Sequence, residues 1–220
     1  MHLFRNTSEK NSVNSHEELA NAITHAIGVI LSLLGGGLLI DKAIGLKDHR
    51  VLISFIIYGS SVLFLFLAST LYHSFTNQVL KKRWRVIDHI GIYLMIAGTY
   101  TPFAMVTLKG WWGNLLLGLV WSIAIAGIIF KIFFTGKLKL FSTASYLVMG
   151  WIAVIAVKPL YETLHFNGLL LMVVGGLLFS AGVIFYLRKK GPFNHAIWHL
   201  FVLGGSICHF FAIFLYSYPQ

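Results

Sequence analysis

Residues 51–73 read VLISFIIYGSSVLFLFLASTLYH, and this stretch decides the fold class of the chain. It contains no lysine, arginine or acidic residue, and it exceeds the roughly 20 apolar residues that a helix needs to cross a bilayer. Over all 220 residues, 57% are hydrophobic and 11% are charged, whereas a soluble domain carries about 25% charged residues. The composition excludes an ordinary soluble domain and indicates an integral membrane protein.

Six other apolar runs are separated by basic residues or by proline and glycine. The seven expected spans are 19–40, 51–73, 86–107, 112–130, 141–157, 166–187 and 195–216. The fifth run is the weakest, because it is short and contains serine and threonine. The runs lack the two-residue alternation of barrel strands, so we expect an all-α membrane protein with seven helices. Residues 1–18 form a polar tail without a secretory signal, and residues 19–220 form one transmembrane domain.

Positive charge is distributed unevenly along this pattern. With the tail placed inside, twelve lysine and arginine residues fall on the inner side and five on the outer side. This predicts a cytoplasmic N-terminus and an external C-terminus, the reverse of the G-protein-coupled receptors. Contact between inner loops and anionic lipid head groups explains the net charge of +10 better than nucleic-acid binding does. No feature of the sequence indicates an oligomeric state.

Ionisable residues inside a span are expensive and therefore mark candidate sites. With Cys208 as the single cysteine, a metal site has to use histidine and acidic residues. The candidates inside or at the edge of a run are His25, His73, Asp88, His89, His195, His199 and His209. Asp88 is the one acid within the expected spans. Read alone, it is an interfacial acid paired with the arginines of the preceding loop.

Two pairs of polar residues change that interpretation of Asp88. Ser69 and His73 are four residues apart on the second run, and His195 and His199 are four apart on the seventh, so each pair shares a helix face. The topology places both pairs and Asp88 at the cytoplasmic ends of three helices. Three neutral imidazoles and a water molecule make up a catalytic zinc site.

The remaining polar residues take supporting roles in this hypothesis. Asp88 and Ser69 hydrogen-bond and orient the water, with Asp88 as the base because Ala196 stands where a HExxH zinc protease carries glutamate. His25 is expected to pack between helices in preference to supporting the site. His209 is expected to be a core residue, and His89 an interface residue.

The set Ser69-x-x-x-His73, Asp88 and His195-x-x-x-His199 resembles the three-part signature of the progestin and adipoQ receptor family. Residues 17–25, EELANAITH, resemble its bacterial hemolysin III-like branch, and the resemblance extends from about residue 15 to the end of the chain. It implies seven helices with a cytoplasmic N-terminus in a bacterial plasma membrane. It also implies zinc bound by the three histidines, with the aspartate and serine beside its water.

The wider superfamily includes alkaline ceramidases, so the resemblance implies hydrolysis of a lipid. The leading hypothesis is a zinc-dependent intramembrane hydrolase that cleaves a lipid amide or ester, releases free fatty acid and serves membrane-lipid homeostasis. One alternative is a pore-forming cytolysin, as the branch name suggests, although no secretory signal supports it. Another is a receptor or sensor in which zinc is structural. A metal transporter is disfavoured because the polar residues cluster at one face.

Overall fold

The computed structural model describes residues 2–108, 110–188 and 191–218, and every regular element in them is helical. The elements are α1 (His2–Leu46), α2 (His49–Ser74), α3 (Gln78–Pro102), η1 (Phe103–Leu108), α4 (Gly110–Phe134), α5 (Lys139–Gly150), η2 (Ile152–Ala156), α6 (Val157–Thr163), α7 (Phe166–Leu187) and α8 (Asn194–Tyr216). Seven segments of the described residues are long and apolar enough to cross a membrane. The predicted all-α membrane fold with seven spans is confirmed, while its orientation stays a prediction.

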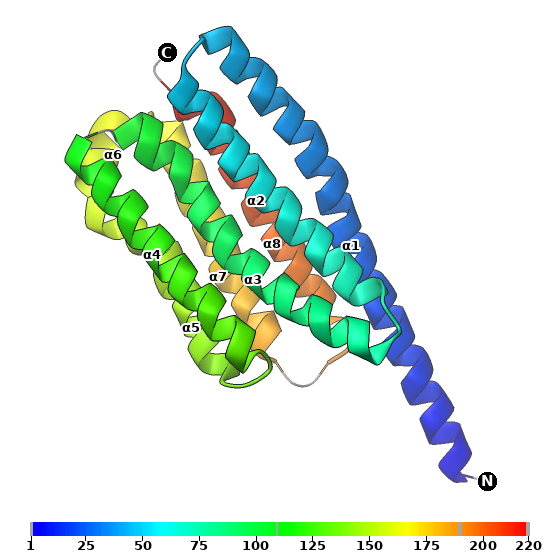
Figure 1. The fold of residues 1–220 in the computed structure, drawn as a ribbon. Helices are drawn as coiled ribbons and strands as arrows, with labels where there is room; N and C mark the ends of the chain where they lie inside the picture. The colour runs from blue at the N-terminus through cyan, green and yellow to red at the C-terminus, as the bar shows by residue number, and fades with distance from the viewer. Residues whose placement is uncertain (1, 109, 189–190, 219–220) are drawn as a thin grey trace.

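The first span begins earlier than the apolar pattern suggests. Helix α1 continues from His2 through the polar residues to Leu46, and the segment Ser15–Leu46 is long and apolar enough to cross a membrane. No proline lies between these residues to remove a backbone donor and end the helix. The polar N-terminal part of α1 projects beyond the bundle as a continuation of the helix (Figure 1), and Glu18, directly before the apolar run, reaches the site described below.

The fifth span is not one continuous helix. Its α-helical part ends at Gly150, a 3₁₀ segment follows, and α6 resumes at Val157 with Pro159 in its first turn. The hydroxyl of Tyr100, from α3, donates to the Gly150 carbonyl at 2.6 Å and accepts from the Ala153 N–H at 3.0 Å. A side chain inserted at the break thus bonds two backbone groups that leave the helical pattern.

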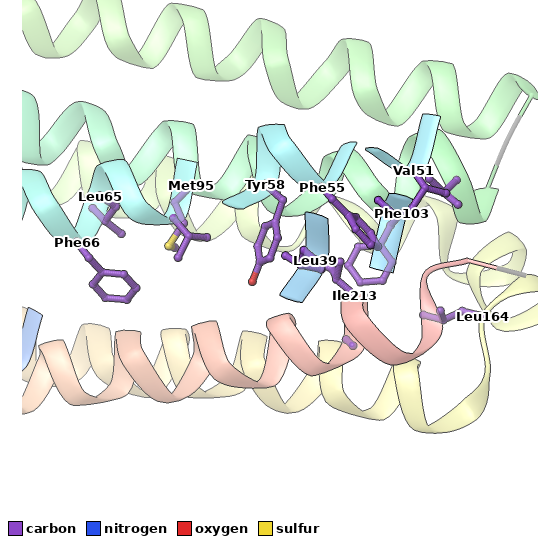
Figure 2. Close-up of a cluster of buried hydrophobic side chains, with 14 of the residues drawn as sticks. Leu39, Val51, Phe55, Tyr58, Leu65, Phe66, Met95, Phe103, Leu164 and Ile213 are labelled. Carbon is purple, nitrogen blue, oxygen red and sulfur yellow. The ribbon is translucent and has the colours of Figure 1, made fainter. Parts of the chain in front are cut away.

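The first helices and the last one surround an apolar core. Helix α1 packs against α2 and α8, α2 against α3, and α7 against α8. Figure 2 shows Phe55, Tyr58 and Phe66 pointing from α2 into the space between α2 and α8. The ring of Phe66 meets His25 edge-on, with centroids 5.1 Å apart. The apolar core therefore ends at a polar layer.

Short connections bring that layer to one end of the bundle. Only residues 75–77 separate α2 from α3, so the C-terminal end of α2 and the N-terminal end of α3 lie together. The C-terminal end of α7 and the N-terminal end of α8 lie at the same end (Figure 1). The rings of His73 and His195 have centroids 5.1 Å apart, and Asp88 and His195 line the same cavity.

Candidate metal centre

Three histidines from α2 and α8 form a close group. One donor atom from each of His73, His195 and His199 lies within 4.8 Å of those of the other two. The ring centroids of His73 are 5.1 Å from those of His195 and His199, and the latter two are 4.6 Å apart. His73 and His199 are buried, and His195 is half-buried. The three predicted ligands are thus close enough to bind one metal ion.

Oxygen atoms of helix α1 determine which ring nitrogen carries the proton in His73 and His199. The Nδ1 of His73 donates to Glu18 Oε2 at 2.8 Å. The Nδ1 of His199 lies 3.2 Å from the Asn21 carbonyl and 3.2 Å from Thr24 Oγ1. Because carboxylate and carbonyl oxygens only accept hydrogen bonds, the proton sits on Nδ1 and leaves a lone pair on Nε2. That is the tautomer that a histidine needs in order to bind a metal through Nε2.

Buried polar atoms without partners gather around the same rings. In the described part of the chain, six buried side-chain atoms have no hydrogen-bond partner. They are Asn21 Oδ1, His25 Nδ1 and Nε2, Ser69 Oγ, His73 Nε2 and His199 Nε2. Each unpaired buried group costs about 1–3 kcal/mol, and native proteins leave few. Their clustering on α1, α2 and α8 fits a site built for a bound ion and its water.

Asp88 lies beside this group, on α3. Its side chain is buried, with the residue 6% exposed, and its carboxylate faces Ser69 and His73. The Ser69 hydroxyl makes no hydrogen bond of ordinary geometry. No arginine or lysine among the described residues lies within ion-pair distance of Asp88. The structure therefore does not support the interpretation of Asp88 as an interfacial acid paired with loop arginines.

The other histidines differ in their surroundings. The His25 ring stacks on His199, with centroids 3.5 Å apart and planes inclined by 15°. His25 packs between helices, as expected. The residue it packs against is His199, one of the three candidate metal ligands. His209 Nε2 lies 3.1 Å from the Met172 carbonyl and its ring packs against Phe179, which agrees with the predicted core role. His89 Nδ1 lies 3.5 Å from Asp88 Oδ2 and 2.7 Å from the Arg85 carbonyl.

Sequence reasoning assigned no role to Glu18, Asn21 or Thr24. Glu18 and Asn21 are three residues apart and His25 follows four later, so they share one face of α1. A polar stripe at the start of an apolar helix is the signal that could have identified them.

An apolar cavity of about 190 Å³ extends from the site into the bundle. Asp88 and His25 are among its polar lining residues, and its apolar wall includes Met95, Phe103 and Val173. Gly150 and Ala153, at the break in the fifth span, line it as well. The candidate metal centre therefore adjoins a space that suits an apolar chain.

Seven spans and a three-histidine group beside an apolar cavity define a multi-pass membrane protein with a candidate metal site. The chain belongs to the haemolysin-III related family, whose model matches residues 13–210, within the progestin and adipoQ receptor family.

Three relatives cover nearly the whole chain. Hemolysin-3 of Bacillus cereus is 50% identical over 203 residues, which are 92% of this chain and 93% of the relative. The Hemolysin-3 homolog of Bacillus subtilis (strain 168) is 53% identical over 200 residues, covering 91% and 94%. The monocyte to macrophage differentiation factor of Homo sapiens is 31% identical over 212 residues, covering 92% and 85%. With the seven apolar helices, the bacterial relatives place the protein in the bacterial cell membrane.

Proposed function

We propose that this protein is a zinc-dependent intramembrane hydrolase that cleaves an amide or ester bond of a membrane lipid and releases free fatty acid. The observation that carries the proposal is the position of the three histidines and Asp88 beside an apolar cavity. Such a reaction would serve membrane-lipid homeostasis.

The residues that hold the ion are His73, His195 and His199. Three histidines are the protein ligands of known catalytic zinc sites, and zinc fits this nitrogen donor set. When bound, the ion supplies Lewis acidity that polarises a carbonyl and acidifies water. Glu18 and the Asn21 carbonyl hold two of the rings in the tautomer required for binding.

Asp88 is the acid–base residue of the proposal. Its carboxylate takes the proton of the attacking water and returns it to the leaving amine or alkoxide. The Ser69 hydroxyl faces Asp88 and is free to donate to that carboxylate or to orient the water. Burial of both side chains keeps bulk water away from the reacting atoms.

The apolar cavity accounts for the lipid substrate. Met95, Phe103 and Val173 present hydrocarbon along its wall, which suits an acyl chain. A lipid bound with its chain there places the head-group linkage near Asp88, at the polar end of the cavity.

The proposal is tested with purified protein in lipid nanodiscs, by measuring metal content and fatty-acid release from a panel of lipid amides and esters. We expect about one zinc per chain and turnover on at least one lipid. His195→Ala should lose both, whereas His49→Ala, an exposed histidine at the other end of the bundle, should lose neither. Full turnover by a His195→Ala protein that binds no metal would contradict the proposed role.

Two other functions have specific support and separate predictions. The name of the Bacillus cereus relative describes a hemolysin, and liposome leakage that persists in His195→Ala would favour a pore. The site also joins α1, α2 and α8, as a structural metal in a receptor or sensor does. Loss of thermal stability on chelation, with no turnover on any lipid, would favour that function.

A further inference from the structure

A second cavity, of about 240 Å³, lies at the same end of the bundle. We call it the basic vestibule, and its wall includes Arg85, Asp88, Lys131, Lys137, Lys139 and His195. These residues come from α3, α4, the start of α5, the loop between α4 and α5, and α8. Four of them are cations and one is a carboxylate, so the wall carries an excess of positive charge.

The basic vestibule and the apolar cavity meet at the candidate metal centre. Both have Asp88, Ile92, Tyr186 and Trp198 in their walls. The basic vestibule also reaches His195, one of the three candidate ligands. A single molecule with a charged end and an apolar end can therefore lie in both cavities, with the bond between its two ends beside Asp88.

Lys131 distinguishes this cavity from an ordinary basic loop. Lysines at the cytoplasmic ends of spans ordinarily extend into water or among lipid head groups. Lys131 is 2% exposed, and its Nζ donates to Ser142 Oγ at 2.7 Å and lies 5.6 Å from the Tyr146 ring centroid. No carboxylate in the described part of the chain lies within ion-pair distance of this Nζ.

A buried ammonium without an ion pair is costly, because it has left water without gaining a counter-charge. Its remaining donors adjoin a cavity that three other cations line. Asp88, in the same wall, interacts with Lys131 only from beyond ion-pair distance. An anion in this cavity would supply a counter-charge in direct contact. A phosphate fits best, since it accepts hydrogen bonds from several lysines at once and a bidentate pair from Arg85.

We propose that the basic vestibule binds the phosphate-bearing head group of an anionic lipid whose acyl chain occupies the apolar cavity. As a statement about substrate class, this rests on the hydrolase proposed above, and it restricts that substrate to anionic lipids. Binding itself requires no turnover. Free inorganic phosphate shares the head-group chemistry and is the competing ligand.

The test uses the full-length protein in neutral detergent and titrates phosphatidylglycerol, phosphatidylcholine and inorganic phosphate, with bound ligand counted by native mass spectrometry. We expect phosphatidylglycerol to bind at least about tenfold more tightly than phosphatidylcholine, and inorganic phosphate to bind weakly. Lys131→Gln should remove most of this preference and Lys131→Arg should retain it. The matched control is Lys82→Gln, an exposed lysine of α3 at the same end and outside the wall, which should keep the preference.

Each other outcome has a defined meaning. Equal affinity for the two lipids overturns the proposal, and so does an equal loss in Lys82→Gln, which would reveal general surface electrostatics. Phosphate that binds alone and displaces the lipid shows a site for the free anion instead. If Lys131→Gln does not fold, Arg85→Gln, at an exposed side chain, replaces it with the same expected loss.

The two proposals fail separately. Retained lipid preference without fatty-acid release overturns the hydrolase alone. Fatty-acid release without lipid preference overturns the basic vestibule alone.

Discussion

Glu18 on α1 and His73 on α2 are joined by a hydrogen bond of 2.8 Å, although 55 residues separate them in the chain. The same carboxylate oxygen lies 2.8 Å from the Nζ of Lys81, which fixes the carboxylate from its other side. A carboxylate behind a ligating histidine orients the ring and raises its basicity. The first helix therefore takes part in the candidate metal centre without supplying a ligand.

Glu18→Gln should weaken zinc binding about 10- to 100-fold, because loss of a carboxylate that is hydrogen-bonded to a ligating histidine typically lowers metal affinity by that factor. The substitution keeps the size of the side chain and removes its negative charge. Competition with a fluorescent chelator measures the affinity. Glu162→Gln, an exposed acid outside the site, is the control. An unchanged affinity in Glu18→Gln would show that the hydrogen bond only packs two helices.

Asp88→Asn should separate metal binding from chemistry. Asparagine keeps the shape but cannot take up the proton, so turnover should fall by about 10²-fold or more. Zinc content should stay near that of the unchanged protein, because the three histidines remain. Fatty-acid release and metal analysis on one preparation check both expectations, with Asp41→Asn, an exposed acid, beside it. A fully active Asp88→Asn would remove this residue from the proposed mechanism.

Metal removal should lower thermal stability. A ligand bound only by the folded state stabilises it by RT ln(1 + [L]/Kd), or about 4 kcal/mol at a thousand times Kd. Treatment with a chelator should therefore lower the unfolding midpoint, and zinc should restore it. His195→Ala should start lower and show no further response to the chelator. Equal chelator sensitivity in both proteins would place the responsible metal elsewhere.

Two glycines of α4 give a matched test of the packing between α4 and η1. A Cβ on Gly113 would lie 2.2 Å from the Ala104 carbonyl oxygen, whereas a Cβ on Gly118 meets nothing within 4 Å. Because a backbone atom cannot move aside, Gly113→Ala should destabilise the protein by about 1–3 kcal/mol. Gly118→Ala should be neutral or slightly stabilising. Denaturation of both variants in detergent checks the difference, and similar midpoints would argue against this contact.

The features of the fold and of the candidate site that depend only on local sequence could be predicted. Seven spans follow from the length and apolarity of the runs, and the paired histidines follow from a four-residue spacing that holds on any helix. The hydrogen-bond partners of the histidines could not be predicted from spacing. Glu18 and Asn21 contact the rings of His73 on α2 and His199 on α8 only after three helices have packed together. The break in the fifth span likewise depends on the Tyr100 hydroxyl, from another helix.

The charge pattern places Lys131 among the basic residues at one end of the bundle, but it does not indicate that this side chain is buried. Position in the sequence gives the side of the membrane on which a lysine lies. Whether it ends in water or inside a cavity depends on the packing of α4 against Ser142 and Tyr146 of α5.

The dependence of the site on both ends of the chain has a consequence for biosynthesis. His73 is translated early, but His195 and His199 come from the last helix, and α1 holds rings from both α2 and α8. A nascent chain that has not inserted α8 carries one of the three ligands. Tight loading of the proposed ion would therefore require the completed bundle, and metal occupancy would then report that the last span has been inserted and docked.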